Sequence, residues 1–181
     1  MPLLKSDYYT TQDIFNLPEG ERAELIDGKM YMMAPPGSAH QILVMGLSAA
    51  FFNHIQKKDG PCKVLPAPFA VFIKKDDSNY VEPDVSVICN TDLISDRGCE
   101  GAPDLVIEVV SPCSRRMDYN IKNALYSSAG VREYWIVDPA KERTTIYYYE
   151  QDAAPMIIPF HQEVISGIYE DLKIKIADLL N

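Results

Sequence analysis

The stretch PDLVIEVVSPCSRRMDYNIKNALYSSAGVREYWIVD, residues 103–138, decides the fold of this chain. Its first part, Leu105–Val110, is aliphatic apart from one glutamate, which is typical of a central strand covered on both faces. The run Ser111-Pro112-Cys113-Ser114 ends that strand and begins a helix to about Ala129, with Gly130 as the C-terminal stop. A further strand, Glu133–Val137, follows. The stretch predicts an α/β protein.

Helices and short strands are expected before this stretch. Thr10 and Asp13 are spaced as a capping box for a helix Thr11–Leu17. Asp27-Gly28 between apolar residues predicts a β-hairpin over Glu24–Met33. A long helix is expected from Ala39 to about Lys58, because apolar residues recur there at helical spacing. The members of this apolar stripe are Ile42, Met45, Ala49, Phe52 and Ile55.

The remaining segments favour strands joined by short turns. Strands are expected at Cys62–Ala67, Phe69–Lys74, Tyr80–Cys89, Thr144–Tyr149, within Met156–Val164 and at Leu172–Ile176. The 181 residues contain no internal repeat or linker, so residues 1–181 are expected to form a single domain. The order of elements predicts a mixed central β-sheet flanked by helices, and not a regularly alternating doubly wound sheet.

Composition and charge restrict the partners and the compartment. The net charge of −9 argues against broad, non-specific coating of nucleic acid, which needs a basic face. The four cysteines are widely spaced and only three histidines accompany them, which argues against a zinc site. Cys89 in its apolar run is expected to be a free, hydrophobic thiol. The start lacks the apolar core of a signal peptide, and no apolar run approaches the ~20 residues of a membrane span. A cytoplasmic protein without membrane contact is expected.

Two acidic residues interrupt the aliphatic strands. Glu108 lies in the middle of LVIEVV, and Asp84 begins the aliphatic part of VEPDVSVI. A buried, unpaired carboxylate is costly, so each acid must be paired or bound to a metal. Two carboxylates on adjacent strands suit Mg²⁺, with water and a substrate phosphate completing the octahedron. The alternative is that each acid pairs with a cation or lies at a strand end in water.

The helix after the Glu108 strand supplies a cation. Its stripe toward the sheet is predicted to be Met117, Ile121, Ala124, Leu125 and Ser128. Lys122 lies at the edge of this stripe and could reach the carboxylates while its stem stays packed. Asp118 and Tyr126 lie one turn away on the same edge. The alternative is a surface pair between Asp118 and Lys122.

These motifs together resemble one family. An EPD strand, a PDL-x-x-EV-x-S strand, a D-x-x-x-K helix and GV-x-EYW-x-VDP occur in this order, preceded by AELIDGKMYMMAPPGSAH. The pattern is similar to that of the Uma-type endonuclease family, once catalogued as a domain of unknown function, in the PD-(D/E)XK restriction-endonuclease-like superfamily. The resemblance covers nearly the whole chain and implies a restriction-endonuclease-like core.

The resemblance assigns roles to individual residues. Asp84 takes the place of the first acid of the motif and Glu108 that of the second. The motif's lysine would stand two residues after Glu108, where this chain has Val110. The resemblance implies that Lys122 on the following helix fills that role.

Other residues are expected around the metal. Glu24 resembles the N-terminal acid of the family, which would bind a second metal or orient water, and its alternative is a solvated strand residue. His40 and Tyr126 are candidates for the same surroundings, although packing explains His40 equally well. Paired arginines, Arg115 and Arg116, could contact phosphate, whereas the tyrosines at 147–149 fit strand packing.

The sequence therefore predicts a nuclease that uses Mg²⁺ or Mn²⁺ to hydrolyse phosphodiester bonds of nucleic acid, DNA rather than RNA. A homodimer is left open. The rival hypothesis is a catalytically silent interaction or regulatory module that keeps the fold, and Val110 together with the acidic charge favours it. A glycosidase-like carboxylate pair is a third alternative, but Lys122 beside two acids fits phosphate better than sugar chemistry.

Overall fold

A six-stranded mixed sheet forms the centre of the molecule. The computed structural model describes residues 8–74, 76–151 and 153–181. The strand order is β10-β9-β8-β7-β4-β3; β7 and β8 are parallel and all other neighbours are antiparallel. The strands are β3 (Lys63–Pro66), β4 (Val85–Ile88), β7 (Leu105–Val109), β8 (Glu133–Asp138), β9 (Arg143–Tyr148) and β10 (Met156–Pro159). The predicted α/β class with a mixed central sheet is confirmed.

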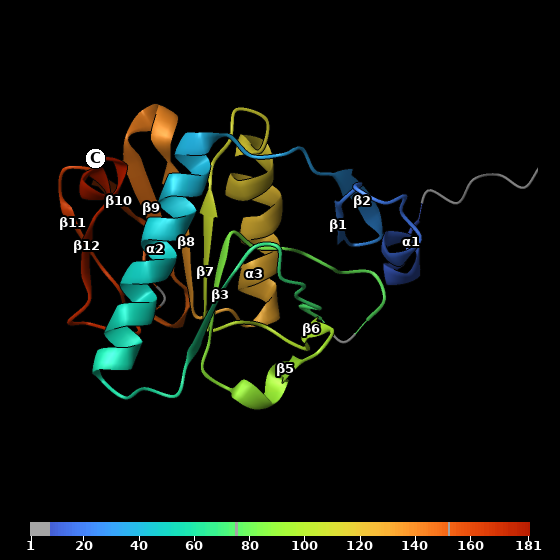
Figure 1. The fold of residues 1–181 in the computed structure, drawn as a ribbon, viewed down its shortest axis with the longest axis horizontal. Coiled ribbons are helices and arrows are strands. Elements are labelled where there is room, and N and C mark those ends of the chain that lie inside the picture. Colours follow the sequence, from blue (N-terminus) through green and yellow to red (C-terminus); the bar gives the residue numbers. More distant parts are fainter. Residues whose placement is uncertain (1–7, 75, 152) are drawn as a thin grey trace, which may run out of the picture.

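Helices cover both faces of this sheet. Helix α2 (Ser38–Lys57) lies on one face, and a helix of residues 115–129 lies on the other (Figure 1). The second helix contains a π-helical segment, η2 (Met117–Lys122), that continues as α3 (Asn123–Ala129) and ends at Gly130 with φ 93°. Within the described ranges, no helix combines the length and the apolar character that crossing a membrane requires.

Strand β7 divides its side chains between the two helical layers. Leu105, Ile107 and Val109 belong to the apolar cluster that includes Leu47 of α2. Val106, by contrast, belongs to the cluster beneath α3. Because side chains alternate along a strand, Glu108 points to the α3 side with Val106. A side-chain partner for Glu108 from a helix must therefore come from the helix of residues 115–129.

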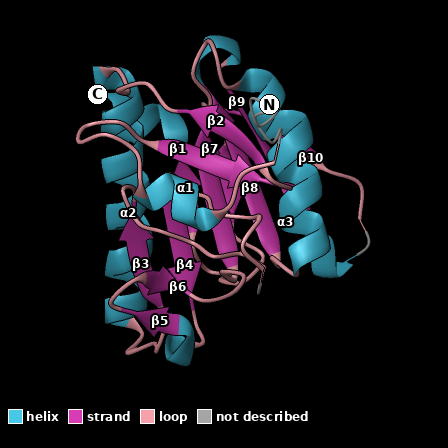
Figure 2. Cartoon of the chain, turned by 90° about the vertical axis from the view of Figure 1, so that its right-hand side faces the viewer, coloured by secondary structure: helices cyan, strands magenta, loops and turns pink. Residues whose placement is uncertain are grey.

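The N-terminal part forms a small unit beside the sheet. Helix α1 (Thr11–Phe15) precedes the hairpin of β1 (Ala23–Ile26) and β2 (Lys29–Met32), as predicted. Asp27 and Gly28 form its turn with φ values of 47° and 74°. Figure 2 shows α1 and the hairpin in front of the main sheet. A bridge between Leu25 and Tyr80 attaches β1 to the chain that leads into β4.

Smaller elements complete the chain. They are β5 (Ile94–Ser95) paired with β6 (Gly98–Cys99), β11 (Glu163–Ile165) paired with β12 (Lys173–Lys175), and the 3₁₀ turns η1 (Thr91–Leu93), η3 (Pro139–Lys141), η4 (Tyr149–Gln151) and η5 (Ile176–Leu180). The strand predicted at Phe69–Lys74 is wrong. Only Val71 makes bridges there, to Val81 and to Cys99.

The predicted inner face of the long helix is also wrong. Ile42, Met45 and Phe52 are 49%, 69% and 52% exposed, and of the predicted stripe only Ile55 is fully buried. The buried side chains are Leu43, Val44, Leu47, Ser48, Phe51 and Ile55. Helix α2 has apolar residues on both sides, so helical periodicity fits two opposite faces. The packing against the sheet selects one of them.

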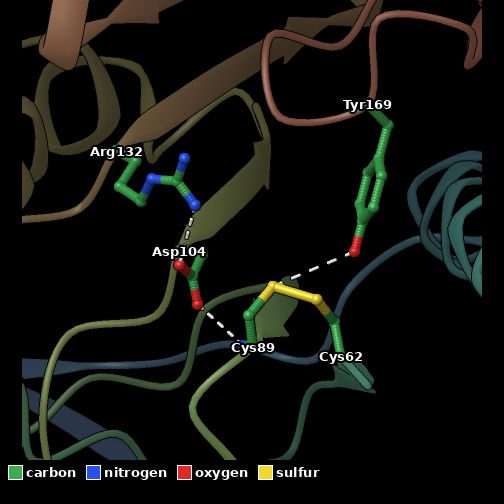
Figure 3. Close-up of a disulfide and its surroundings, with 5 residues drawn as sticks. All are labelled: Cys62, Cys89, Asp104, Arg132 and Tyr169. Atoms are coloured by element: carbon green, nitrogen blue, oxygen red, sulfur yellow. Dashed lines mark hydrogen bonds and ion pairs between the residues drawn. A yellow bond between two sulfur atoms is a disulfide. The ribbon is translucent and has the colours of Figure 1, made fainter. Parts of the chain in front are cut away.

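A disulfide joins the edge strand β3 to β4, contrary to the expected free thiol at Cys89. Cys62 and Cys89 form an S–S bond of 2.08 Å (Figure 3). The register that pairs Lys63 with Ile88 continues outward to place these two cysteines opposite each other. The wide sequence spacing concealed this pairing. Cys99 and Cys113 are free thiols, the first buried and the second exposed.

Removing this disulfide should destabilise the fold. The bond closes a loop with a sequence separation of 27 residues, for which the chain-entropy account gives about 3–4 kcal/mol. We expect the Cys62→Ser/Cys89→Ser variant to show that loss in urea unfolding under non-reducing conditions. With reductant present, the variant and the wild type should become similar. Cys113→Ser is the control, and equal stability of all three proteins without reductant would contradict the bond.

Candidate active site

The ammonium group of Lys122 lies between two buried carboxylates. Lys122 Nζ is 2.8 Å from Glu108 Oε1 and 2.9 Å from Glu24 Oε1. The hydroxyl of Tyr126 donates to the same Glu108 oxygen at 2.6 Å. All four residues are buried. The hairpin, the central strand and the helix on its α3 side therefore meet at one charged group.

Asp84 holds a second part of the site at the start of β4. Its Oδ2 accepts a hydrogen bond of 2.7 Å from the backbone N–H of Val109 and lies 3.1 Å from Nε2 of His40. Since Val85 pairs with Ile107, Asp84 stands opposite Glu108 on the neighbouring strand. Burial alone would lower the pKa of His40, but the carboxylate of Asp84 outweighs it and raises that pKa overall. The predicted position of the two acids on adjacent strands is confirmed.

The predicted stripe of the helix of residues 115–129 is confirmed for Met117, Ile121 and Leu125, which pack in the apolar cluster, and is wrong for Ala124 and Ser128. The fully buried side chains of the helix are Asp118, Lys122, Leu125 and Tyr126. Ala124 and Ser128, expected inside, are exposed. The buried face also includes Asp118 and Lys122, which helical periodicity does not predict, because it assumes that only apolar side chains face inward. The alternative of a surface pair between Asp118 and Lys122 is wrong.

Asp118 is a buried acid whose location sequence reasoning missed. Its Oδ2 accepts a hydrogen bond of 2.6 Å from Ser114 Oγ. Burial raises the pKa of Asp118 to about 6, although the charge of Lys122 opposes the rise. The D-x-x-x-K spacing was the available signal, because it places Asp118 and Lys122 on one side of the helix.

Burial and the neighbouring carboxyl groups determine the pKa values of Glu108 and Lys122. Burial raises the pKa of Glu108, Lys122 opposes that rise, and the charges of Asp84, Asp118 and Glu24 add to it. Burial would lower the pKa of Lys122, but Glu108 and the other carboxylates raise it well above its ordinary value. Lys122 therefore remains a cation at neutral pH.

The carboxylate oxygens of the site could bind a divalent cation. They would supply only some of its ligands, and water would supply the others. Four carboxyl groups, from Glu24, Asp84, Glu108 and Asp118, accompany one lysine and one histidine, so acidic side chains outnumber basic ones at the site. Lys122 and Tyr126 both bind Oε1 of Glu108, which leaves Oε2 for another ligand. In the part of the chain that the structure describes, no three His, Cys, Asp or Glu side chains form a ready metal cluster. Such a site fits Mg²⁺, which usually takes one or two carboxylates and keeps several waters.

Neighbouring residues orient the site from outside. The backbone N–H of Glu82 donates to Glu24 Oε1 at 3.0 Å, and Glu82 itself binds Arg22 and the hydroxyl of Tyr80. Arg115, a candidate for phosphate contact, is held by Asp138 through bonds of 2.6 and 3.1 Å. Arg116 is exposed.

The mixed sheet and its two helical layers define a restriction-endonuclease-like fold. A solved structure supports this class: the crystal structure of a "putative nuclease belonging to DUF820" from Anabaena variabilis matches with a TM-score of 0.73 and 20% identity. The match covers 94% of this chain and 97% of that one.

The sequence comparisons identify the family. The model of the Uma2 family, described as "Putative restriction endonuclease", matches residues 7–172, and the chain belongs to this family. The uncharacterized protein slr1290 of Synechocystis is 28% identical over 141 residues, 77% of this chain and 73% of that protein. The recognition of an Uma-type family and of its fold is confirmed.

Removing Lys122 should destabilise the folded protein. Lys122→Met leaves Glu24 and Glu108 buried without their shared cation, and loss of one partner of a buried ion pair costs about 3–5 kcal/mol. The Lys122→Met/Glu108→Gln variant should recover part of this loss, because one uncompensated charge is removed. Urea unfolding of both variants and of Glu108→Gln measures the coupling. Additive single effects would show that the two side chains do not interact.

The raised pKa of Asp118 should appear in the pH dependence of stability. A carboxyl group whose pKa rises from 3.8 to about 6 on folding binds a proton in the folded state, so stability falls as pH rises through this interval. Asp118→Asn should match the wild type near pH 4. Above pH 6 it should be more stable by on the order of 2–3 kcal/mol.

Urea unfolding between pH 4 and pH 7.5 in the presence of a metal chelator measures this difference. The exposed acid Asp178 provides the matched control, since Asp178→Asn makes the same change on the surface, outside the buried group. A pH-independent difference between Asp118→Asn and the wild type would contradict the assignment.

Proposed function

We propose that this protein hydrolyses phosphodiester bonds of nucleic acid in a reaction that depends on Mg²⁺ or Mn²⁺. The observation that carries the proposal is the placement of Lys122 against Glu108 in a buried group that contains more carboxylates than cations. A purely structural ion pair would be expected to balance its charges. DNA rather than RNA is proposed as the substrate, and the description of the family as a restriction endonuclease supports this choice.

Asp84 and Glu108 would hold the metal ion. Their carboxylates lie on adjacent strands, and Asp84 is fixed by the N–H of Val109. A bound divalent ion polarises the phosphate and lowers the pKa of an attacking water.

Lys122 would stabilise the negative charge that develops on the phosphate oxygens, because it stays protonated. Glu24 and Glu108 hold its ammonium, and Tyr126 fixes Glu108. Glu24, His40 and Tyr126 are therefore proposed as positioning residues; a second metal at Glu24 would have to displace Lys122.

The silent-module alternative is weakened by the position of Lys122. The main support for a silent module was that Val110 occupies the position of the motif's lysine. Val110 does lie in the apolar cluster beneath α3. The structure shows, however, that an ammonium group still reaches Glu108 from the helix. The net charge of −9 remains in its favour.

We also propose a cytoplasmic location for the protein. The disulfide Cys62–Cys89 stands against it, because such bonds are rare in reducing compartments.

A cleavage assay tests the function directly. Wild-type protein with Mg²⁺ or Mn²⁺ should cleave at least one of linear, supercoiled or single-stranded DNA, and excess chelator should abolish cleavage. Asp84→Asn should lose at least about two orders of magnitude in rate, the scale of one lost electrostatic group. Asp178→Asn, on an exposed acid, is the control. Cleavage by Asp84→Asn at the wild-type rate would exclude this site.

Metal binding should also stabilise the fold. A ligand that binds only the folded state at 100 times its dissociation constant adds about 2.7 kcal/mol. Millimolar Mg²⁺ or Mn²⁺ should therefore raise the Tm of the wild type but not that of Glu108→Gln. An unchanged wild-type Tm together with no cleavage would favour the silent module.

A further inference from the structure

The outer face of helix α2 carries an apolar stripe that stays exposed among the residues the structure describes. Ile42, Met45 and Phe52 are 49%, 69% and 52% exposed, and Ala49 is half-buried between them. These residues follow one another at intervals of three, four and three, so they form a continuous line along the helix. In Figure 1, α2 lies on the same side of the sheet as β11, β12 and the C-terminal end of the chain. The stripe lies on the face opposite the one that packs in the core.

The stripe contains no charge in a strongly acidic protein. Ser38, Gln41, Asn53 and Gln56 are exposed beside it and are polar and uncharged, and the exposed charge of the helix is Lys57 at its C-terminal end. The whole chain nevertheless has a net charge of −9. Two copies of an acidic protein repel each other over most of their surface, and an uncharged face is where they can approach without that repulsion.

The spacing of the stripe is symmetric about its centre. When two copies of α2 pack antiparallel around residue 47, Ile42 of one copy faces Phe52 of the other, and Met45 faces Ala49. The large, most exposed Met45 thereby meets a small residue, as ridge-into-groove packing requires. A twofold axis generates this kind of self-complementary contact, in which one patch serves both partners.

We propose that the stripe Ile42-Met45-Ala49-Phe52 docks against the same stripe of a second copy of this chain, with the two α2 helices antiparallel. A membrane surface fits less well, because membrane-bound amphipathic helices are rich in Lys and Arg on their polar face. The stripe is about 15 Å long at 1.5 Å per residue. It is too small by itself for a standard interface of about 1,200–2,000 Å², so the dimer is weak, with a micromolar dissociation constant.

Sedimentation of the full chain over a range of micromolar concentrations tests the proposal. The wild type should show a monomer–dimer equilibrium, and Met45→Glu should raise its dissociation constant at least about tenfold, the change that 1.4 kcal/mol produces. Ile157→Glu is the matched control, because Ile157 is an apolar residue 57% exposed on edge strand β10, and it should leave the equilibrium unchanged. A monomer at every concentration, or a dimer that Met45→Glu does not weaken, overturns the proposal.

Cross-linking tests the antiparallel arrangement. In a Cys113→Ser background, which removes the exposed native thiol, a mixture of Ile42→Cys and Phe52→Cys chains should form an intermolecular disulfide. Neither variant alone should do so, because each new thiol faces the other position. Cross-linking of either variant alone, or sedimentation of a monomeric wild type with anionic phospholipid vesicles, would overturn the assignment.

Discussion

The structure depends on the burial of Lys122 between Glu24 and Glu108. An ammonium group excluded from water needs close carboxylates, and a buried carboxylate needs a cation equally. The two acids come from the N-terminal hairpin and from the central strand, while the lysine comes from the helix. Joining these charges therefore fixes the hairpin and the helix against the sheet. The same contact brings together the groups to which we assign the proposed metal-dependent hydrolysis.

Much of the fold could be predicted from the sequence because local signals agreed with one another. The hairpin turn Asp27-Gly28, the aliphatic run around Glu108 and the helix stop at Gly130 each had an unambiguous local cause. The inner face of α2 could not be predicted in the same way. A helix that is apolar on two sides has no single preferred face until the sheet is in place, and the expected stripe was the outer one. The pairing of Cys62 with Cys89 likewise depends on the register of two strands.

The sequence predicted which residues belong to the candidate site better than it predicted how they contact one another. Asp84 and Glu108 were recognisable because an acid in an aliphatic strand is costly, and the family pattern added Lys122 and Glu24. The sequence could not show that Glu24 and Glu108 share one ammonium group, since this contact joins three separate elements. It also could not show that Asp118 is buried. Charge compensation in three dimensions, which periodicity does not contain, determines that face of the helix.

We propose that Asp84 and Glu108 hold a divalent metal beside Lys122. A crystal structure of the wild type soaked in Mn²⁺, with anomalous scattering measured, tests it most directly. We expect an anomalous peak at about 2.0–2.3 Å from a carboxylate oxygen of each acid, the range of oxygen ligands to such ions. If a crystal soaked at a saturating Mn²⁺ concentration shows no peak between Asp84 and Glu108, these two residues do not hold the metal.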